Sequence, residues 1–276
     1  MSNPEKISIV VVTYHNDFLL LQRLLQSIYK YWNPNHLSNI CIILNDRMMY
    51  SNEFNKLIEN NTNPSFKIKT FFAYDLEPKI ECFDWHSQQL LKCLSANIVD
   101  TDWYVINDCK DFYINPVDIS DIFDEEGRAT IQLDHSRFPS DTRVSPIKTS
   151  AWAPGPFSLA LKNSFEVFNI DFQDHKRIHF PTTTPFIVKT EIMRNMVSEL
   201  KQTLKGFFRF LFSIHLDGQS FVTEFLLYGA YCFKTTGYKD YADWNSNHRK
   251  FYTLVSQSKD LRIVDLPTNT SQCNVE

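Results

Sequence analysis

The feature that most constrains the fold is a run of β-branched residues followed at once by an amphipathic segment. Residues 7–14, ISIVVVTY, are apolar at nearly every position, which is typical of a strand buried on both faces of a parallel sheet. Within residues 15–32, apolar side chains recur at helical spacing, and Pro34 follows where such a helix would stop. The pair predicts one strand and one helix of an α/β domain.

The same alternation continues through the first half of the chain. Residues 39–46, NICIILND, predict a second buried strand, residues 65–74 a third, and residues 102–108, DWYVIND, the next. Between the last two, residues 84–98 predict a helix with Asp84 as its N-cap. Strands that alternate with helices indicate an α/β fold with a mostly parallel, Rossmann-like sheet and helices on both faces.

The second half of the chain is less regular. Residues 129–134 predict a strand, whereas residues 135–157 carry four prolines and predict a loop. A helix is expected from about Lys189, after a polar loop, and another over residues 217–233.

Composition excludes several classes of protein. The chain has 276 residues, 43% of them hydrophobic, and is expected to form one domain over residues 1–276. A net charge of −4 argues against nucleic acid as a partner. Six cysteines without a CxxC or CxxH pair argue against a zinc cluster or a disulfide scaffold, and favour a reducing, cytoplasmic setting. Neither GxGxxG nor GxxxxGK[ST] occurs.

No segment predicts a membrane anchor. The N-terminus leads directly into the first expected strand, so no signal peptide is expected. The most apolar late segment, GFFRFLFSIHL, is shorter than the roughly 20 residues of a membrane span and contains Arg209. Peripheral association with a membrane is compatible with both observations.

Polar side chains follow three of the expected strands. These polar segments are residues 14–17, residues 45–46 and residues 107–111. In parallel sheets, ligands bind beyond the carboxyl ends of the strands, which is where these segments are expected to lie. For Asp108, Lys110 and Asp111 two interpretations stay open. They form a solvated junction, or they form a pyrophosphate or metal site, in which a carboxylate holds a divalent cation and the lysine adds positive charge.

The predicted helix over residues 84–98 carries a second group of candidates. Trp85, Gln88, Gln89 and Lys92 recur at i, i+3, i+4 and i+7, so they share one face. Either this face is simply exposed, or it contacts ribose and phosphate, with Trp85 against a sugar or base.

Two further candidates lie late in the chain. Thr182, Thr183 and Thr184 form either a turn or a hydroxyl-rich loop for an acceptor. Glu224 stands on an otherwise apolar helix, where a buried carboxylate needs a partner. Burial would also raise its pKa, as a general base requires.

Several of these segments carry a family resemblance. ISIVVVTYHNDFLLLQRLLQSI resembles the opening of GT-A-type glycosyltransferases. FDWHSQQLLKCLSANIVDTDWYVINDCKDFYINP is similar to DUF6492-like glycosyltransferases, which have a W..QQ..K helix, a hydrophobic strand and a segment like LDAKNFFIRP. PTTTPFIVKTEIM and FVTEFLLYGAY resemble later segments of that group. The resemblance implies a GT-A-like domain, with a nucleotide-sugar half over about residues 1–116 and an acceptor half over about residues 117–276.

The resemblance also implies an activity and residue roles. A sugar would move from a nucleotide-diphosphate donor, with UDP-sugar favoured, to a hydroxyl of a glycan or glycoconjugate. Catalysis would involve Asp108, Lys110 and Glu224, and the acceptor side Thr182, Thr183 and Thr184. Donor contacts would come from Thr13, Tyr14, Asp17, Asp46, Trp85, Gln88, Gln89, Lys92 and Asp111.

One departure from the GT-A pattern bears on the cofactor. Asp108 would match the first acid of the aspartate–any–aspartate metal motif, but Lys110 stands where the second acid belongs. Asp111 lies one residue beyond that position, and in an extended chain its side chain would point to the opposite face. Two possibilities therefore stay open for the positive charge at the diphosphate. Either Asp108 and other groups hold Mn²⁺ or Mg²⁺, or Lys110 supplies the charge instead.

Two other functions remain as alternatives. A catalytically inactive nucleotide- or glycan-binding module would keep the fold without turnover. A phosphodiester or nucleotidyl-transfer enzyme would need a two-metal carboxylate cluster, for which the sequence offers few matched acids.

Overall fold

A computed structural model shows a five-stranded sheet at the centre of the protein, in the order β3-β2-β1-β4-β7. The structure describes residues 4–80, 83–131, 156–171, 184–203, 222–243 and 252–254. The strands of this sheet are β1 (Ile7–Thr13), β2 (Leu37–Leu44), β3 (Ile68–Phe72), β4 (Trp103–Asn107) and β7 (Phe186–Lys189). The first four run parallel to one another, so the predicted mostly parallel α/β sheet is confirmed.

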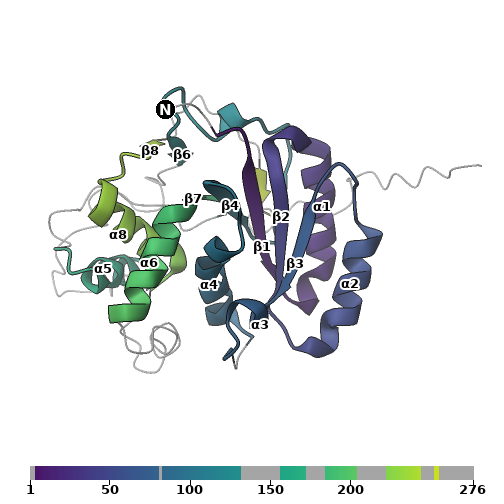
Figure 1. Ribbon diagram of the computed structural model, residues 1–276, viewed down its shortest axis with the longest axis horizontal. Coiled ribbons are helices and arrows are strands. Elements are labelled where there is room, and N and C mark those ends of the chain that lie inside the picture. Colours follow the sequence, from purple (N-terminus) through teal and green to yellow (C-terminus); the bar gives the residue numbers. More distant parts are fainter. Residues whose placement is uncertain are drawn as a thin grey trace, which may run out of the picture.

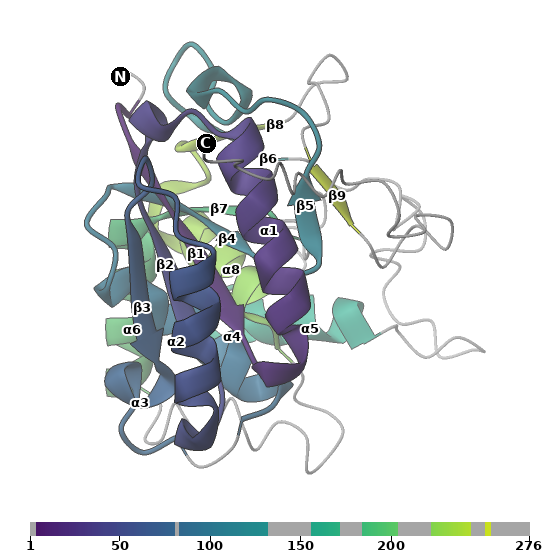
Figure 2. The same ribbon diagram turned by 90° about the vertical axis from the view of Figure 1, so that its right-hand side faces the viewer.

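Helices cover both faces of the sheet (Figures 1 and 2). On one face lie α1 and α2, and on the other lie α4, α6 and α8, with α5 packed against α8. The helices are α1 (Phe18–Tyr31), α2 (Ser51–Asn60), α3 (Ala73–Leu76), α4 (Trp85–Leu94), α5 (Pro156–Val167), α6 (Thr190–Thr203) and α8 (Glu224–Thr236).

Smaller elements complete the described fold. Strand β5 (Asp111–Tyr113) pairs with β9 (Tyr252–Leu254), and β6 (Ala129–Ile131) pairs with β8 (Tyr241–Asp243). Single 3-10 turns span His15–Asp17, Pro34–His36, Met48–Tyr50, Ser95–Asn97 and Ile119–Asp121.

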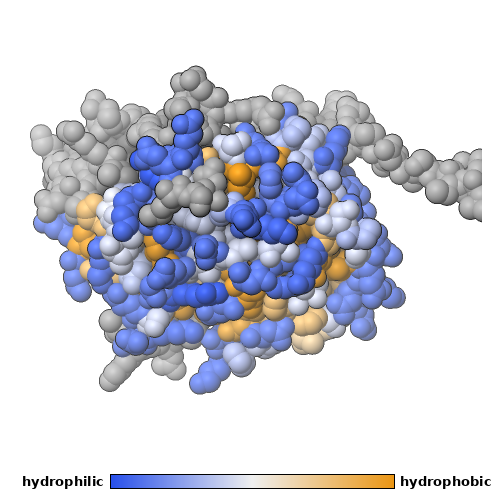
Figure 3. Space-filling model, turned by 45° about the horizontal axis from the view of Figure 1, so that its top comes forward, coloured by the Kyte–Doolittle hydropathy of each residue, from blue (hydrophilic) through white to orange (hydrophobic). Residues whose placement is uncertain are grey.

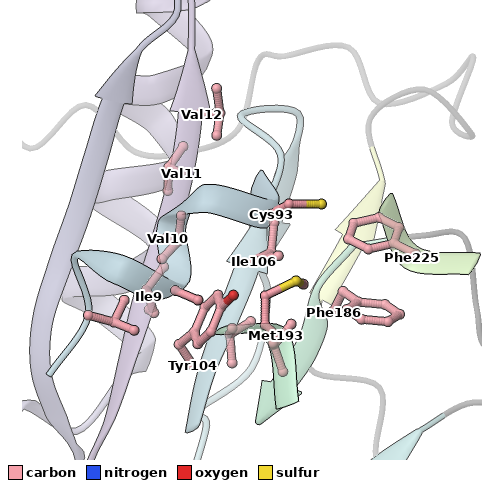
Figure 4. Packing of buried hydrophobic residues seen from close by; sticks show 14 of the residues in the cluster. Ile9, Val10, Val11, Val12, Cys93, Tyr104, Ile106, Phe186, Met193 and Phe225 are labelled. Atoms are coloured by element: carbon pink, nitrogen blue, oxygen red, sulfur yellow. The ribbon is translucent and has the colours of Figure 1, made fainter. Parts of the chain in front are cut away.

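The core explains why the first strand carries so many β-branched residues. All seven residues of β1 are buried, because β2 and β4 flank it and helices cover both of its faces. Figure 4 shows Val10, Val11 and Val12 following one another along β1. Beside β4, the ring of Phe186 on β7 stacks on Phe225 of α8 with 4.2 Å between ring centroids. Each fully buried side chain of this size contributes about 1.5–3 kcal/mol.

The predicted helix over residues 84–98 is confirmed and begins as expected. Helix α4 starts at Trp85, and the Asp84 carboxylate accepts hydrogen bonds from the backbone N–H groups of His86 and Ser87 (2.9 and 3.0 Å). The helix ends at Leu94 and continues as a 3-10 turn.

The second half departs from the sequence predictions in three places. Strand β7 precedes α6 where a loop was expected, and it runs antiparallel to β4. Residues 156–157 begin α5 instead of ending a loop, and residues 135–155 lie outside the described residues. Helix α8 begins at Glu224, capped by the Thr223 hydroxyl, whereas the predicted helical residues 217–221 lie outside the described part.

The surface view in Figure 3 is mainly hydrophilic, with separate smaller hydrophobic areas. Among the described residues, no helix combines the length and the apolar character needed to cross a membrane.

Candidate functional site

The topology of the sheet singles out one edge of the molecule. From β1 the chain moves outward to β2 and β3, and it then returns to form β4 on the other side of β1. The carboxyl ends of β1 and β4 therefore flank the point where the connections diverge, which is where open α/β sheets bind ligands.

A cleft with a volume of about 310 Å³ opens at this edge. Its lining comes from the segments that follow β1, β2 and β4 and from the start of α4. The lining residues are Thr13, Tyr14, Asp17, Leu20, Asn45, Phe83, Asp84, Trp85, Gln88, Asp108, Cys109 and Lys110. The three polar strand ends identified in the sequence thus meet in one place.

Two aromatic side chains at the cleft are well exposed. Tyr14 is 39% exposed and Trp85 is 43% exposed, although large aromatic side chains are mostly shielded from water elsewhere in the described fold. Phe83 also belongs to the lining. Exposed aromatic faces at a polar cleft suit a planar base or the apolar face of a sugar.

The amide of Asn45 fixes the relation between the end of β2 and the start of α4. Its Nδ2 donates to the carbonyl of Asp84 (3.1 Å), and its Oδ1 accepts from the Ser87 hydroxyl (3.0 Å). Gln88, one residue further along α4, lines the cleft. Asn45 therefore shapes the wall on which Gln88 stands.

Three carboxylates and one ammonium group line the cleft. Asp84 is occupied as the cap of α4, and its pKa lies below the usual range because hydrogen bonds from Ser87 and His86 outweigh the effect of burial. Asp17 has a raised pKa, first through burial and then through the nearby Asp108 charge. The ammonium of Lys110 is half-exposed and lies 3.6 Å from the Asp108 carboxylate.

Behind the cleft, Lys92 of α4 joins two carboxylates from distant parts of the chain. Its Nζ lies 2.8 Å from Oδ1 of Asp108 and donates to Oε1 of Glu224 at 3.1 Å. The side chains of Lys92 and Glu224 are 3% and 2% exposed, and that of Asp108 is 21% exposed. The two carboxylates raise the pKa of Lys92 against the opposing effect of burial, and the lysines hold the pKa of Asp108 below its usual range although burial acts the other way.

A tight turn separates Asp108 from Asp111. The Asp111 N–H donates to the Asp108 carbonyl (3.0 Å), and the chain then enters β5. Asp111 is fully buried and accepts a hydrogen bond from the Thr184 hydroxyl. Burial raises its pKa to about 7, with the Asp108 charge adding to the effect. The bend therefore directs Asp111 into the interior and away from the cleft.

The sequence profile of one protein family matches residues 5–257, almost the whole chain. The chain belongs to the DUF6492 family. This family is described as a family of unknown function. No curated protein matches the chain. The DUF6492 part of the resemblance is thereby confirmed, and the activity stays a prediction.

In this DUF6492 protein the predicted site residues fall into distinct groups. The cleft brings together Thr13, Tyr14, Asp17, Trp85, Gln88, Asp108 and Lys110. Buried outside the lining are Gln89, Lys92, Asp111, Thr184 and Glu224. Thr182 and Thr183 lie outside the described residues.

Asp46 is also buried outside the lining, and its oxygens bind the protein itself. Oδ2 accepts from the backbone N–H of His15 (2.9 Å) and lies 2.6 Å from its Nδ1, while Oδ1 accepts from the N–H of Arg47 (2.8 Å). The His15 ring stacks on Tyr50. Asp46 therefore ties together the two loops that follow β1 and β2.

Sequence reasoning did not single out every residue of the lining. Phe83 and Cys109 were not predicted as site residues, although each directly precedes or follows a residue that was discussed. Asp84 was identified only as a helix cap, and Asn45 only as part of a strand end. The position of a residue next to a strand end or a helix cap was the available signal.

The described residues do not fit a divalent metal centre. Among them no group of three or more His, Cys, Asp or Glu side chains could hold a metal ion. Asp108, the predicted metal ligand, is paired with two ammonium groups that would repel a cation.

Proposed function

We propose that this protein is a glycosyltransferase that moves a sugar from a nucleotide-diphosphate donor, UDP-sugar favoured, to a hydroxyl of a glycan or glycoconjugate. The observation that carries the proposal is the cleft at the switch point of the sheet, which combines exposed aromatic faces, carboxylates, an amide and a lysine. The sequence resemblance to GT-A-type enzymes supports it.

The nucleotide is assigned to the aromatic part of the cleft. Stacking of a base on an aromatic side chain is worth about 1–3 kcal/mol and tolerates different bases. Tyr14 and Trp85 offer such faces, and Gln88 offers both a donor and an acceptor for ribose or base.

The diphosphate is assigned to Lys110. The described lining contains this one ammonium group and three carboxylates. An anionic group of a ligand therefore gains most electrostatic energy by lying beside Lys110. Carboxylates accept hydrogen bonds from hydroxyl groups, which suits ribose and the transferred sugar. Asp17 and Asp108 are the two carboxylates of the lining that make no helix-capping hydrogen bond.

In the proposed reaction, the acceptor oxygen forms a bond to the anomeric carbon while the bond from that carbon to the diphosphate breaks. Lys110 stabilises the negative charge that develops on the leaving diphosphate. The acceptor proton must pass to a base within about 3 Å of the hydroxyl. Glu224, the base expected from sequence, is buried against Lys92 and does not line the cleft, so the proposal gives it no contact with the acceptor.

The proposal is tested by isothermal titration of UDP, GDP and a panel of their sugar conjugates, in Mn²⁺ and in EDTA, followed by assays of donor hydrolysis and transfer. Trp85→Ala is expected to weaken binding. Met49→Ala provides the matched control, since Met49 is 72% exposed and does not line the cleft. Absence of binding by every nucleotide and conjugate would make the proposal wrong. Binding without hydrolysis or transfer in any arm would identify an inactive binding module.

A further inference from the structure

The ammonium of Lys92 is an unusual group to find inside a protein. The residue is 2% exposed, and its Nζ lies 5.0 Å from the ring centroid of Phe225 as well as beside Asp108 and Glu224. A buried lysine without partners would lose its proton, because burial disfavours the charged form. The two carboxylates keep this one charged.

Lys92 does not line the cleft, and of its two carboxylate partners only Asp108 does. Among the described residues, Asp108 is therefore the direct link between Lys92 and a ligand in the cleft. Glu224 approaches Lys92 from the first turn of α8, where a negative charge also benefits from the helix dipole. Its backbone N–H donates to Oε1 of Gln89, one turn before Lys92 on α4 (3.4 Å).

We propose that Lys92 is a positioning residue, which keeps Asp108 ionised and holds its carboxylate at the floor of the cleft, with Glu224 as its second counter-ion. The inference rests on the proposed function where ligand binding is concerned, because Asp108 is the member of this group that reaches the donor cleft. The state of Asp108 itself is measurable without any ligand.

Charge balance supports this assignment. Asp108 and Glu224 contribute two negative charges, and Lys92 and Lys110 contribute two positive ones. The two lysines differ in position, since the Lys110 side chain is 49% exposed and that of Lys92 is 3% exposed. Because water screens the exposed group, Lys92 exerts the larger influence on Asp108.

The charged groups around Asp108 come from every element packed against it. They are Asp17 after β1, Lys92 on α4, Lys110 in the turn, Asp111 at the start of β5 and Glu224 on α8. A titration of Asp108 must be compared between variants that change one of these groups at a time.

The experiment is a pH titration of the full chain labelled with ¹³C at aspartate carboxyl carbons, with the Asp108 signal assigned through Asp108→Asn. Lys92→Met removes the charge and keeps the length of the side chain, and Lys92→Arg keeps the charge. We expect the Asp108 midpoint to rise by at least about one pH unit in Lys92→Met, to rise less in Lys110→Ala, and to stay low in Lys92→Arg. Equal midpoints in wild type and folded Lys92→Met would overturn the inference.

A second variant covers the case in which Lys92→Met does not fold. Glu224→Gln removes the second carboxylate that pairs with Lys92, so Asp108 becomes the single anionic partner of Lys92 in this pair of contacts. The midpoint of the Asp108 titration is therefore expected to fall below that of wild type. A midpoint that stays unchanged or rises contradicts the inference.

A binding measurement separates failure of this inference from failure of the proposed function. UDP affinity of Lys92→Met, measured at two pH values on either side of its raised Asp108 midpoint, is expected to differ between them by several-fold more than in wild type. Equal pH dependence in the two proteins would overturn the positioning role. If UDP binds neither protein, the proposed function is wrong. The carboxyl titration then still tests whether Lys92 keeps Asp108 ionised.

Discussion

Asp108 directly follows β4 and Asp111, three residues later, begins β5, yet the surroundings of the two residues give them opposite properties. Asp108 lies against two lysine ammonium groups, and these hold its pKa below the usual range against the effect of burial. Asp111 is fully buried with the Thr184 hydroxyl as its hydrogen-bond donor, and burial raises its pKa to about 7. The difference between the two pKa values therefore comes more from the charge of the partner than from burial.

The difference matters for function, because the two groups face different spaces. Asp108 is ionised at the floor of the cleft, where it can accept hydrogen bonds from hydroxyl groups of a ligand. Asp111 lies behind the turn beside β7, and it changes charge near neutral pH. Four consecutive residues thus provide a permanent anion for the ligand and a titrating group for the interior.

The largest effect is expected from removing the charge of Lys92. Lys92→Met leaves two carboxylates without their buried counter-ion, and breaking a buried pair costs about 3–5 kcal/mol in the free energy of unfolding. Urea denaturation followed by circular dichroism measures the loss. Lys69→Ala is the control, because its ion pair with Asp100 is exposed and worth at most about 1 kcal/mol. Similar losses in both variants would contradict the contrast between buried and exposed pairs.

Asp111→Asn tests the second carboxyl group of the comparison through the pH dependence of the free energy of unfolding. The folded-state pKa of Asp111 is raised above its unfolded value, so the folded protein binds the proton more tightly. This contribution to stability is fully present below about pH 4 and is lost as pH rises through about 7. A rise of that size corresponds to at most about 4 kcal/mol.

The variant cannot ionise, so its free energy of unfolding should fall less than that of wild type between pH 4 and pH 8. Urea melts at several pH values provide the measurement, and other titrating groups cancel in the difference. Parallel curves for the two proteins would show that Asp111 does not titrate in this range.

Lys110 tests the exposed lysine of the Asp108 group. Lys110→Ala should weaken UDP binding by about tenfold, or about 1.4 kcal/mol, because a charged hydrogen bond to phosphate is lost while the fold is retained. Lys110→Arg should preserve most of the affinity. Isothermal titration compares these with Lys69→Ala, which changes a lysine on β3 outside the cleft lining. An unchanged affinity in Lys110→Ala removes Lys110 from the diphosphate site.

The smallest effect is expected at Thr184. Thr184→Val deletes the hydroxyl that donates to Asp111, at a cost of about 1 kcal/mol. Since that hydrogen bond lowers the pKa of Asp111, its loss should move the Asp111 titration to higher pH. The ¹³C carboxyl signal of Asp111 reports the change, and a shift to lower pH would be the contrary result.

The sequence predicted the first four strands of the central sheet together with α1 and α4, because the signals for these elements are local, but it did not predict α2 or α3. The β-branched run over residues 7–14 is typical of a buried strand, and Asp84 had the position of a helix cap. The convergence of three polar strand ends followed from the rule that parallel strands share a carboxyl edge. Each of these features depends on residues close together in the chain.

Features that depend on distant residues were not predicted. Glu224 is 132 positions from Lys92, so nothing in either segment reveals the ion pair. Strand β7 is four residues long and forms only because β4 offers it an edge. The inward direction of Asp111 is set by the turn that begins at Asp108, which spacing alone does not fix.

The most direct test of the account is a crystal structure of the protein with UDP. We predict density for the base against Tyr14 or Trp85, and for the diphosphate within ion-pair distance of the Lys110 ammonium, with Lys92 still paired to Asp108 and Glu224. UDP bound away from the carboxyl ends of β1 and β4, or a diphosphate that does not approach Lys110, would contradict the proposed donor site.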